Sequence, residues 1–325
     1  MGGKILKRPT FFLSMTTPMH PPLTPLLKRP PANDWAMALL NGCSQVFLLR
    51  HPLCGLLCLL SIAWGAPQLL GGALLGGFVG WLTAARRHYP QPDINSGLYG
   101  YNGVLLGLLL SAKLAWSPLL PLLIIASAGL ASLLLNRWLR HNRRHASLPA
   151  YTAPFVLFGW LLLALTDTLQ LISNAADPGQ LHGLAVLDWP LAVLRGLSQV
   201  LLVNDPISGL LIFTALWLAN RRMALWALVG SALGLLLGSQ LGHYGEAVQG
   251  LYGFNGALVA VALSQQQRRA WPVLAGIIAS VLLQLGLFYL GLSAPLTAPF
   301  ILACWLVQMA SRLLRRRFKP APASH

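Results

Sequence analysis

The residues best suited to chemistry in this chain are uncharged hydrogen-bonding side chains at matching positions in its two halves. Gln45 lies in the block LLNGCSQVFLLRHPLCGLL, and Gln199 lies in VLRGLSQVLLVNDPISGLL. Thr152 lies in LPAYTAPF, and Thr297 lies in APLTAPF. A glutamine amide offers two donors and an acceptor without charge, and a threonine hydroxyl both donates and accepts. We expect such a set to bind a small, planar, neutral solute that donates hydrogen bonds.

A further repeated block, GLYGYNGVLLGLLL and GLYGFNGALVAVAL, places an aromatic residue four positions before a leucine in each copy. The pairs are Tyr101 with Leu105 and Phe254 with Leu258. Residues four apart share a helix face, so the two pairs would form the flat apolar walls of a slot. Leu48 and Leu202 follow the glutamines by three residues and are expected on the same face as each glutamine.

A purely structural role is the alternative for each of these residues. Glutamines tie membrane helices together, small residues let helices pack closely, and threonine beside proline often satisfies a helix kink. The recurrence of all three blocks favours a binding site, because duplicated membrane folds place their sites where the two halves meet.

The composition is that of a membrane protein. Hydrophobic residues make up 56% of the chain and charged residues only 9%, whereas a soluble domain carries about 25% charge. The net charge is +16, but the basic residues form short runs between apolar stretches, as in cytoplasmic loops. Nucleic-acid binding is therefore not expected. Four cysteines lie in apolar stretches and are expected to pack rather than to form disulfides or bind metal; they are Cys43, Cys54, Cys58 and Cys304.

The apolar stretches form two sets of six. They lie at 35–50, 53–66, 67–85, 99–114, 117–139 and 151–171, and then at 189–203, 206–220, 223–241, 252–264, 271–291 and 298–314. The first stretch of each set is the most polar and stops at Pro52 or Pro206. Proline disfavours helix just before it, so we expect these two stretches to be re-entrant half-helices.

The distribution of basic residues sets the number of crossings. If the other five stretches of each set cross the membrane, every basic run falls on the cytoplasmic side except Lys113, which satisfies the positive-inside rule. We therefore expect an all-α polytopic membrane protein with ten transmembrane helices and cytoplasmic termini. Five crossings per half invert the second repeat, and a pore lies between the two inverted five-span repeats.

The expected organisation has five parts. They are a disordered basic arm at 1–34, a first membrane repeat at 35–172, an extracytoplasmic linker at 173–188, a second repeat at 189–316 and a cytoplasmic tail at 317–325. No Walker, HExxH or GxSxG motif occurs, so neither an enzyme nor a bound cofactor is expected. The few acidic residues lie mostly in predicted loops, which disfavours an ion-coupled transporter.

The repeated blocks resemble the urea transporter family, in its bacterial form, over most of residues 35–315. LPAYTAPF fits the family signature L-P-x-x-T-x-P-F in full, and SAPLTAPF fits its T-x-P-F half. The resemblance implies a homotrimer in the lipid bilayer of the inner membrane, each protomer passing urea passively through its own narrow pore. The alternative is a channel for other small neutral amides or ammonia.

The resemblance also implies a role for each repeated residue. Gln45 and Gln199 would bind the amide groups of urea near the two pore mouths. The narrow midplane stretch would be lined by Thr152, Thr297, Leu105, Leu258 and Val200, and the slot walls would include Tyr101 and Phe254. Some members carry phenylalanine where Leu48 and Leu202 stand, so each slot here would have one aromatic wall and one aliphatic wall.

Overall fold

The structure of the chain, a computed structural model, describes residues 35–145, 147–168, 188–292 and 294–317. All regular structure in these residues is helical. The first half contains α1 (Trp35–Gln45), α2 (Pro52–Gly65), η2 (Pro67–Leu69), α3 (Leu70–Arg86), α4 (Gln91–Asn95), α5 (Tyr101–Lys113), α6 (Leu119–Arg144) and α7 (Ala153–Thr168). The second half contains α8 (Asp188–Ser198), η3 (Gln199–Leu201), α9 (Pro206–Ala219), α10 (Arg221–Gln240), α11 (Tyr244–Val248), α12 (Gly253–Gln266), α13 (Ala270–Tyr289) and α14 (Ala298–Arg317).

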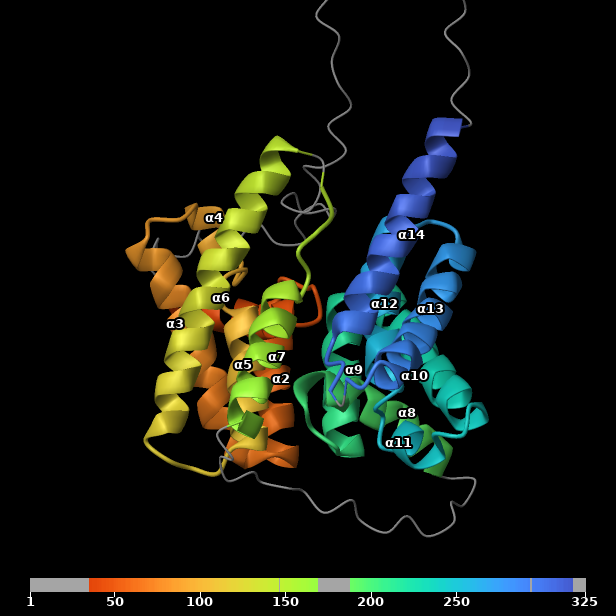
Figure 1. Cartoon of the computed structure of the whole chain (residues 1–325), viewed down its shortest axis with the longest axis horizontal. Coiled ribbons are helices and arrows are strands. Elements are labelled where there is room, and N and C mark those ends of the chain that lie inside the picture. The colour runs from red at the N-terminus through yellow and green to blue at the C-terminus, as the bar shows by residue number, and fades with distance from the viewer. Residues whose placement is uncertain (1–34, 146, 169–187, 293, 318–325) are drawn as a thin grey trace, which may run out of the picture.

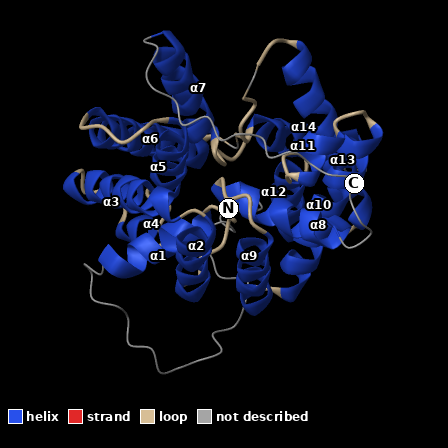
Figure 2. Cartoon of the chain, turned by 90° about the horizontal axis from the view of Figure 1, so that it is seen from below, coloured by secondary structure: helices blue, strands red, loops and turns tan. Residues whose placement is uncertain are grey.

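The helix order of the first half recurs in the second, and the two halves lie side by side (Figures 1 and 2). Each of the twelve predicted apolar stretches coincides with a helix, while the short helices α4 and α11 were not predicted. The predicted arm at 1–34, nearly all of the linker and almost the whole tail lie outside the described residues.

Each half begins with a short helix. The helices α1 and α8 have 11 residues each, about 16 Å of rise, which is half of a hydrocarbon core. The chain then turns through an extended residue, His51 or Asp205, whose side chain accepts a hydrogen bond from the backbone of the next helix. Pro52 and Pro206 occupy the first helical position, where the missing amide hydrogen costs nothing. Across this turn the second half bends by 76°.

Four helical segments are long and apolar enough to cross a membrane alone. They are Pro67–Arg86, Leu119–Arg144, Arg221–Gln240 and Ala270–Tyr289, and the bent pair Trp189–Leu201 with Pro206–Ala219 would make a fifth. Helices such as α2, with 14 residues, span only about 21 Å. By length, the described helices therefore account for four or five of the ten predicted crossings.

Glycines bring the central helices of each half into close contact. A Cβ on Gly76 of α3 would lie 2.0 Å from the carbonyl oxygen of Gly103 in α5. A Cβ on Gly230 of α10 would lie 2.3 Å from the carbonyl oxygen of Gly256 in α12. Only glycine permits this backbone approach, so the helices that carry the GLYG[YF]NG blocks are held against a neighbour in the same way in both halves.

Helices α2 and α9, which occupy equivalent places in the repeat, pack against each other in opposite directions. The Cys54 thiol near the start of α2 donates to the carbonyl of Ala215 near the end of α9, at 2.9 Å. The Ser208 hydroxyl near the start of α9 donates to the carbonyl of Ser61 near the end of α2, at 2.8 Å. The start of each helix thus contacts the end of its counterpart, so equivalent helices run antiparallel.

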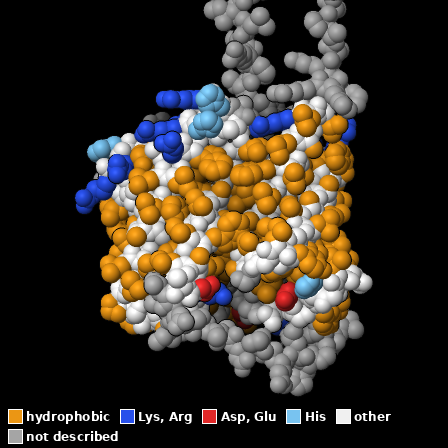
Figure 3. All heavy atoms as spheres, viewed as in Figure 1, with side chains coloured by type: hydrophobic (Ala, Val, Ile, Leu, Met, Phe, Trp, Pro, Cys, Tyr) orange, Lys and Arg blue, Asp and Glu red, His pale blue; other side chains and the backbone are white. Residues whose placement is uncertain are grey.

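The outer surface has the pattern of a membrane protein. Hydrophobic side chains cover the middle of the viewed face, and most of the basic side chains gather at the end where α6 and α14 finish (Figure 3). The last turn of α6 carries His141, Arg143 and Arg144. Positive charge at one end of an apolar band is the arrangement that the positive-inside rule describes.

Candidate functional site

The two glutamines make equivalent hydrogen bonds in the two halves. The Gln45 side-chain amide donates to the carbonyl of Ser96 at 3.1 Å, just before α5. The Gln199 amide donates to the carbonyl of Gln249 at 3.0 Å, just before α12. Both side chains are partly buried. Each bond uses one of the two N–H groups of the side-chain amide, which also carries an oxygen that can accept.

Leu48 and Leu202 end the two half-helices in the left-handed backbone region, with φ of 57° and 58°. This conformation is uncommon for a non-glycine residue and costs free energy. Serine carbonyls hold the turn in place. The backbone N–H of Leu49 donates to the Ser44 carbonyl at 3.3 Å, and in the second half the N–H of Val203 donates to the Ser198 carbonyl at 3.2 Å. The same strained turn is therefore stabilised in the same way in both halves.

These turns leave backbone oxygens open. Within the described residues, no hydrogen bond reaches the carbonyl oxygens of Val46 and Phe47 or those of Val200 and Leu201. At membrane depth, unpaired backbone is tolerated only where it is buried in protein or lines a wet cavity.

The predicted apolar site residues all lie in one connected core. Four of them are buried in that core with at most 3% exposure: Tyr101, Leu105, Val200 and Leu258. The other three are partly buried and pack against the same core: Leu48, Leu202 and Phe254. The Tyr101 hydroxyl does not stand free, because it donates to the backbone carbonyl of Tyr151.

Thr152 and Thr297 meet directly. Their hydroxyl oxygens lie 2.7 Å apart and share a hydrogen bond between the two halves. Both residues are nearly inaccessible, at 1% and 4% exposure. Residues 145 positions apart in the chain thus form one polar point inside an apolar core. One hydroxyl donates to the other, which leaves one O–H and several lone pairs at this point for a third group.

Tryptophans tie the segments before these threonines to the opposite halves. The Trp160 indole of α7 donates to the carbonyl of Ala294, and the Trp305 indole of α14 donates to that of Pro149, both at 2.9 Å. The two bonds are equivalent under the repeat, so each half holds the threonine segment of the other.

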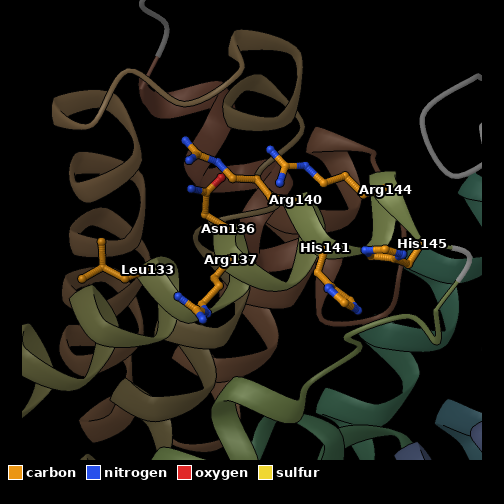
Figure 4. A pocket seen from close by; sticks show the side chains of 7 residues that line it. All are labelled: Leu133, Asn136, Arg137, Arg140, His141, Arg144 and His145. Atoms are coloured by element: carbon orange, nitrogen blue, oxygen red, sulfur yellow. The ribbon is translucent and has the colours of Figure 1, made fainter.

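One groove of the described residues lies apart from this site, while three of the four cysteines belong to the same core as the site residues. A groove at the end of α6 is lined by Leu133, Asn136, Arg137, Arg140, His141, Arg144 and His145 (Figure 4) and contains none of the predicted site residues. The four cysteines are free and buried. No cluster of three or more potential metal ligands occurs in the part of the chain that was searched, namely its described residues.

Comparison with known proteins identifies the family. A model of the family described as "Urea transporter" matches residues 36–312. This chain belongs to the urea transporter family. It is a multi-pass membrane protein of a family of transport proteins, as its apolar helices also indicate.

Individual urea transporters are similar to this chain at moderate identity. Urea transporter 1 of Ovis aries is 27% identical over 250 residues, that of Rattus norvegicus 27% over 254, and that of Mus musculus 26% over 250. Each match covers 71% of this chain and 62% of the relative. The chain thus matches less than two thirds of the length of these urea transporters.

Sequence reasoning missed several polar residues around the two threonines. The Asn102 side-chain oxygen accepts from the backbone N–H of Phe155 at 3.1 Å and thereby caps the start of α7. The Asn255 amide donates to the carbonyl of Leu296 at 3.2 Å. Both asparagines belong to the repeated GLYG[YF]NG block, so their recurrence in a buried stretch was a usable signal. Sequence reasoning also missed a set of hydrogen bonds around the Tyr151 side chain, which has no counterpart in the second half.

Proposed function

We propose that this chain passes urea across a membrane, down the concentration gradient of urea, along a path between its two halves. The hydrogen bond between Thr152 and Thr297 is the observation that carries this proposal. It supplies polar groups at a place where the two halves meet in an apolar core. Urea has four N–H groups and one oxygen, so it needs acceptors wherever it leaves water.

On the proposed path, the other polar groups would lie on either side of the threonine pair. Gln45 and Gln199 supply amide groups near the ends of the path, and the open carbonyls after each half-helix supply acceptors. Tyr101 and Phe254, with the leucines, supply flat apolar walls. This combination suits a small planar molecule without charge, and no acidic pair is required for its passage.

We propose the inverted arrangement for the fold, with five crossings and one re-entrant half-helix in each half. Support comes from the antiparallel packing of α2 and α9 and from the reciprocal tryptophan bonds. The end bearing the arginines of α6 would face the cytoplasm, with both chain termini on that side of the inner membrane. The homotrimer rests on the family resemblance.

Cysteine labelling tests this topology. Cysteines introduced beside Arg143 and beside Arg221 should react with an impermeant reagent from the cytoplasmic side only, and one beside Asp177 from outside only. Labelling beside Arg143 from outside would overturn the crossing count.

Flux measurements test the function. In proteoliposomes, stopped-flow uptake of urea should follow its own gradient and ignore imposed proton, sodium and voltage gradients. Concentrative uptake driven by any of these would exclude the channel. Acetamide and ammonia should be measured in parallel, because the aliphatic Leu48 and Leu202 leave room for other small neutral amides.

A further inference from the structure

Tyr151, the residue immediately before Thr152, is held in an unusual conformation. It is 4% exposed and has a φ of 44°, which lies in the left-handed region that few non-glycine residues adopt. Such a conformation persists only where surrounding contacts over-determine it. The contacts around Tyr151 therefore also determine where the Thr152 hydroxyl lies.

The side chain of Tyr151 is held by two residues of the second half. Its hydroxyl accepts hydrogen bonds from the side-chain amides of Gln308 of α14, at 2.6 Å, and Gln266 of α12, at 3.1 Å. The Gln308 amide also donates to the Gln266 oxygen at 2.8 Å. The Tyr151 backbone is held as well, because its carbonyl accepts from the Tyr101 hydroxyl.

The chain just before Tyr151 is fixed in the same manner. The Leu148 carbonyl accepts hydrogen bonds from Trp138 and Asn142 of α6, at 3.0 and 2.9 Å. The next carbonyl, that of Pro149, accepts from Trp305 of α14. The non-helical segment before Thr152 therefore has backbone carbonyls that accept hydrogen bonds from side chains of both halves.

The second half lacks this network. The repeat mates of Tyr101 and Tyr151 are Phe254 and Leu296, and those of Gln266 and Gln308 are Lys113 and Leu163. Leu296 has the same backbone conformation, with φ of 50°, but its side chain carries no hydrogen-bonding group. Polar anchoring through the side chain therefore exists on one side of the threonine pair only.

We propose that Tyr151 is a positioning residue that sets the spacing of the Thr152 and Thr297 hydroxyls and thereby the size of solute that passes them. The inference rests on the proposed path between the halves. Because the network joins Tyr151 to α12 and α14, it holds the Thr152 segment of the first half against the Thr297 segment of the second. Without it, the pair separates more readily and admits wider solutes.

Replacing Tyr151 with phenylalanine tests the inference. Tyr151→Phe keeps the ring and removes the acceptor for both glutamines. In proteoliposomes, the ratio of N-methylurea flux to urea flux should rise at least about threefold, because the variant loses two hydrogen bonds that restrain the Thr152 segment. The matched control is Tyr252→Phe, since Tyr252 is fully buried and its hydroxyl has no hydrogen-bond partner among the described residues. The control should leave the ratio unchanged.

A cross-linking measurement tests the spacing without any solute. In the double variant Thr152→Cys/Thr297→Cys, mild oxidation should form a disulfide rapidly, because the parent hydroxyls are in contact. Adding Tyr151→Phe should slow the reaction about fivefold, and adding Tyr252→Phe should not. The single Thr152→Cys variant reveals any pairing with the buried native Cys304.

The outcomes separate this inference from the proposed function. An unchanged cross-linking rate and an unchanged flux ratio in assembled Tyr151→Phe protein would overturn the positioning role. If Tyr151→Phe does not assemble, Tyr101→Phe, which releases the Tyr151 carbonyl, must show both effects or the inference is wrong. A parent protein that passes no urea would overturn the proposed function. The cross-linking rates would still test whether Tyr151 sets the distance between positions 152 and 297.

Discussion

Replacing one or both threonines of the pair by valine should change protein stability and urea flux in opposite orders. Thr152→Val removes one hydroxyl, keeps the shape of the side chain and leaves the Thr297 hydroxyl buried without its partner at 2.7 Å. An unsatisfied buried hydroxyl costs about 1–3 kcal/mol, whereas removing both partners with groups of the same shape is nearly neutral. Each single variant should therefore be less stable than the double variant Thr152→Val/Thr297→Val.

Flux should follow the reverse order. A urea molecule passing a single remaining hydroxyl loses part of its hydrogen bonding, about 0.5–1.5 kcal/mol, and should slow roughly two- to tenfold. The double variant replaces the polar point with an apolar one, and a barrier increase of about 1–3 kcal/mol corresponds to roughly five- to 150-fold slower flux. Thermal unfolding in detergent and stopped-flow urea flux at matched protein density measure the two effects.

Two results would refute this reasoning. Additive destabilisation in the double variant would show that the two hydroxyls do not bond to each other, because independent sites add. A double variant that assembles and passes urea like the parent would show that the hydroxyls do not touch the solute. The backbone oxygens that follow the half-helices would then carry the passage alone.

Two further perturbations address the rest of the site. Gln45→Leu or Gln199→Leu keeps similar bulk but removes the amide, and each should slow urea roughly ten- to hundredfold. Unchanged flux in protein that elutes normally from a size-exclusion column would place the glutamines outside the path. Gly209→Ala would put a Cβ 2.1 Å from the carbonyl oxygen of Leu194 and should destabilise the protein by about 1–3 kcal/mol, measured by thermal unfolding. The control is Gly286→Ala, where nothing lies within 4 Å, and equal stability of the two variants would contradict the close contact of α8 with α9.

The sequence was sufficient for features that depend on neighbours along the chain. Pro52 and Pro206 mark the starts of α2 and α9, where proline fits the first helical position. The preceding helices end earlier than the prolines require, at Gln45 and Ser198. The helices followed from runs of apolar residues, and all twelve predicted stretches are helical. Membership of the urea transporter family followed from the repeated blocks and agrees with the match over residues 36–312. The short helix α4 escaped prediction because its five residues carry no periodic pattern.

Contacts between the halves were decided by the tertiary structure alone. The sequence showed that Thr152 and Thr297 are equivalent, but equivalence does not fix a distance, and only packing brings their hydroxyls to 2.7 Å. Nothing in LPAYTAPF indicates that Tyr151 is held by Gln266 and Gln308, because those residues lie more than a hundred positions away. Such a network has no local period or spacing. It exists because the packing of two similar halves places unlike side chains at equivalent positions around one centre.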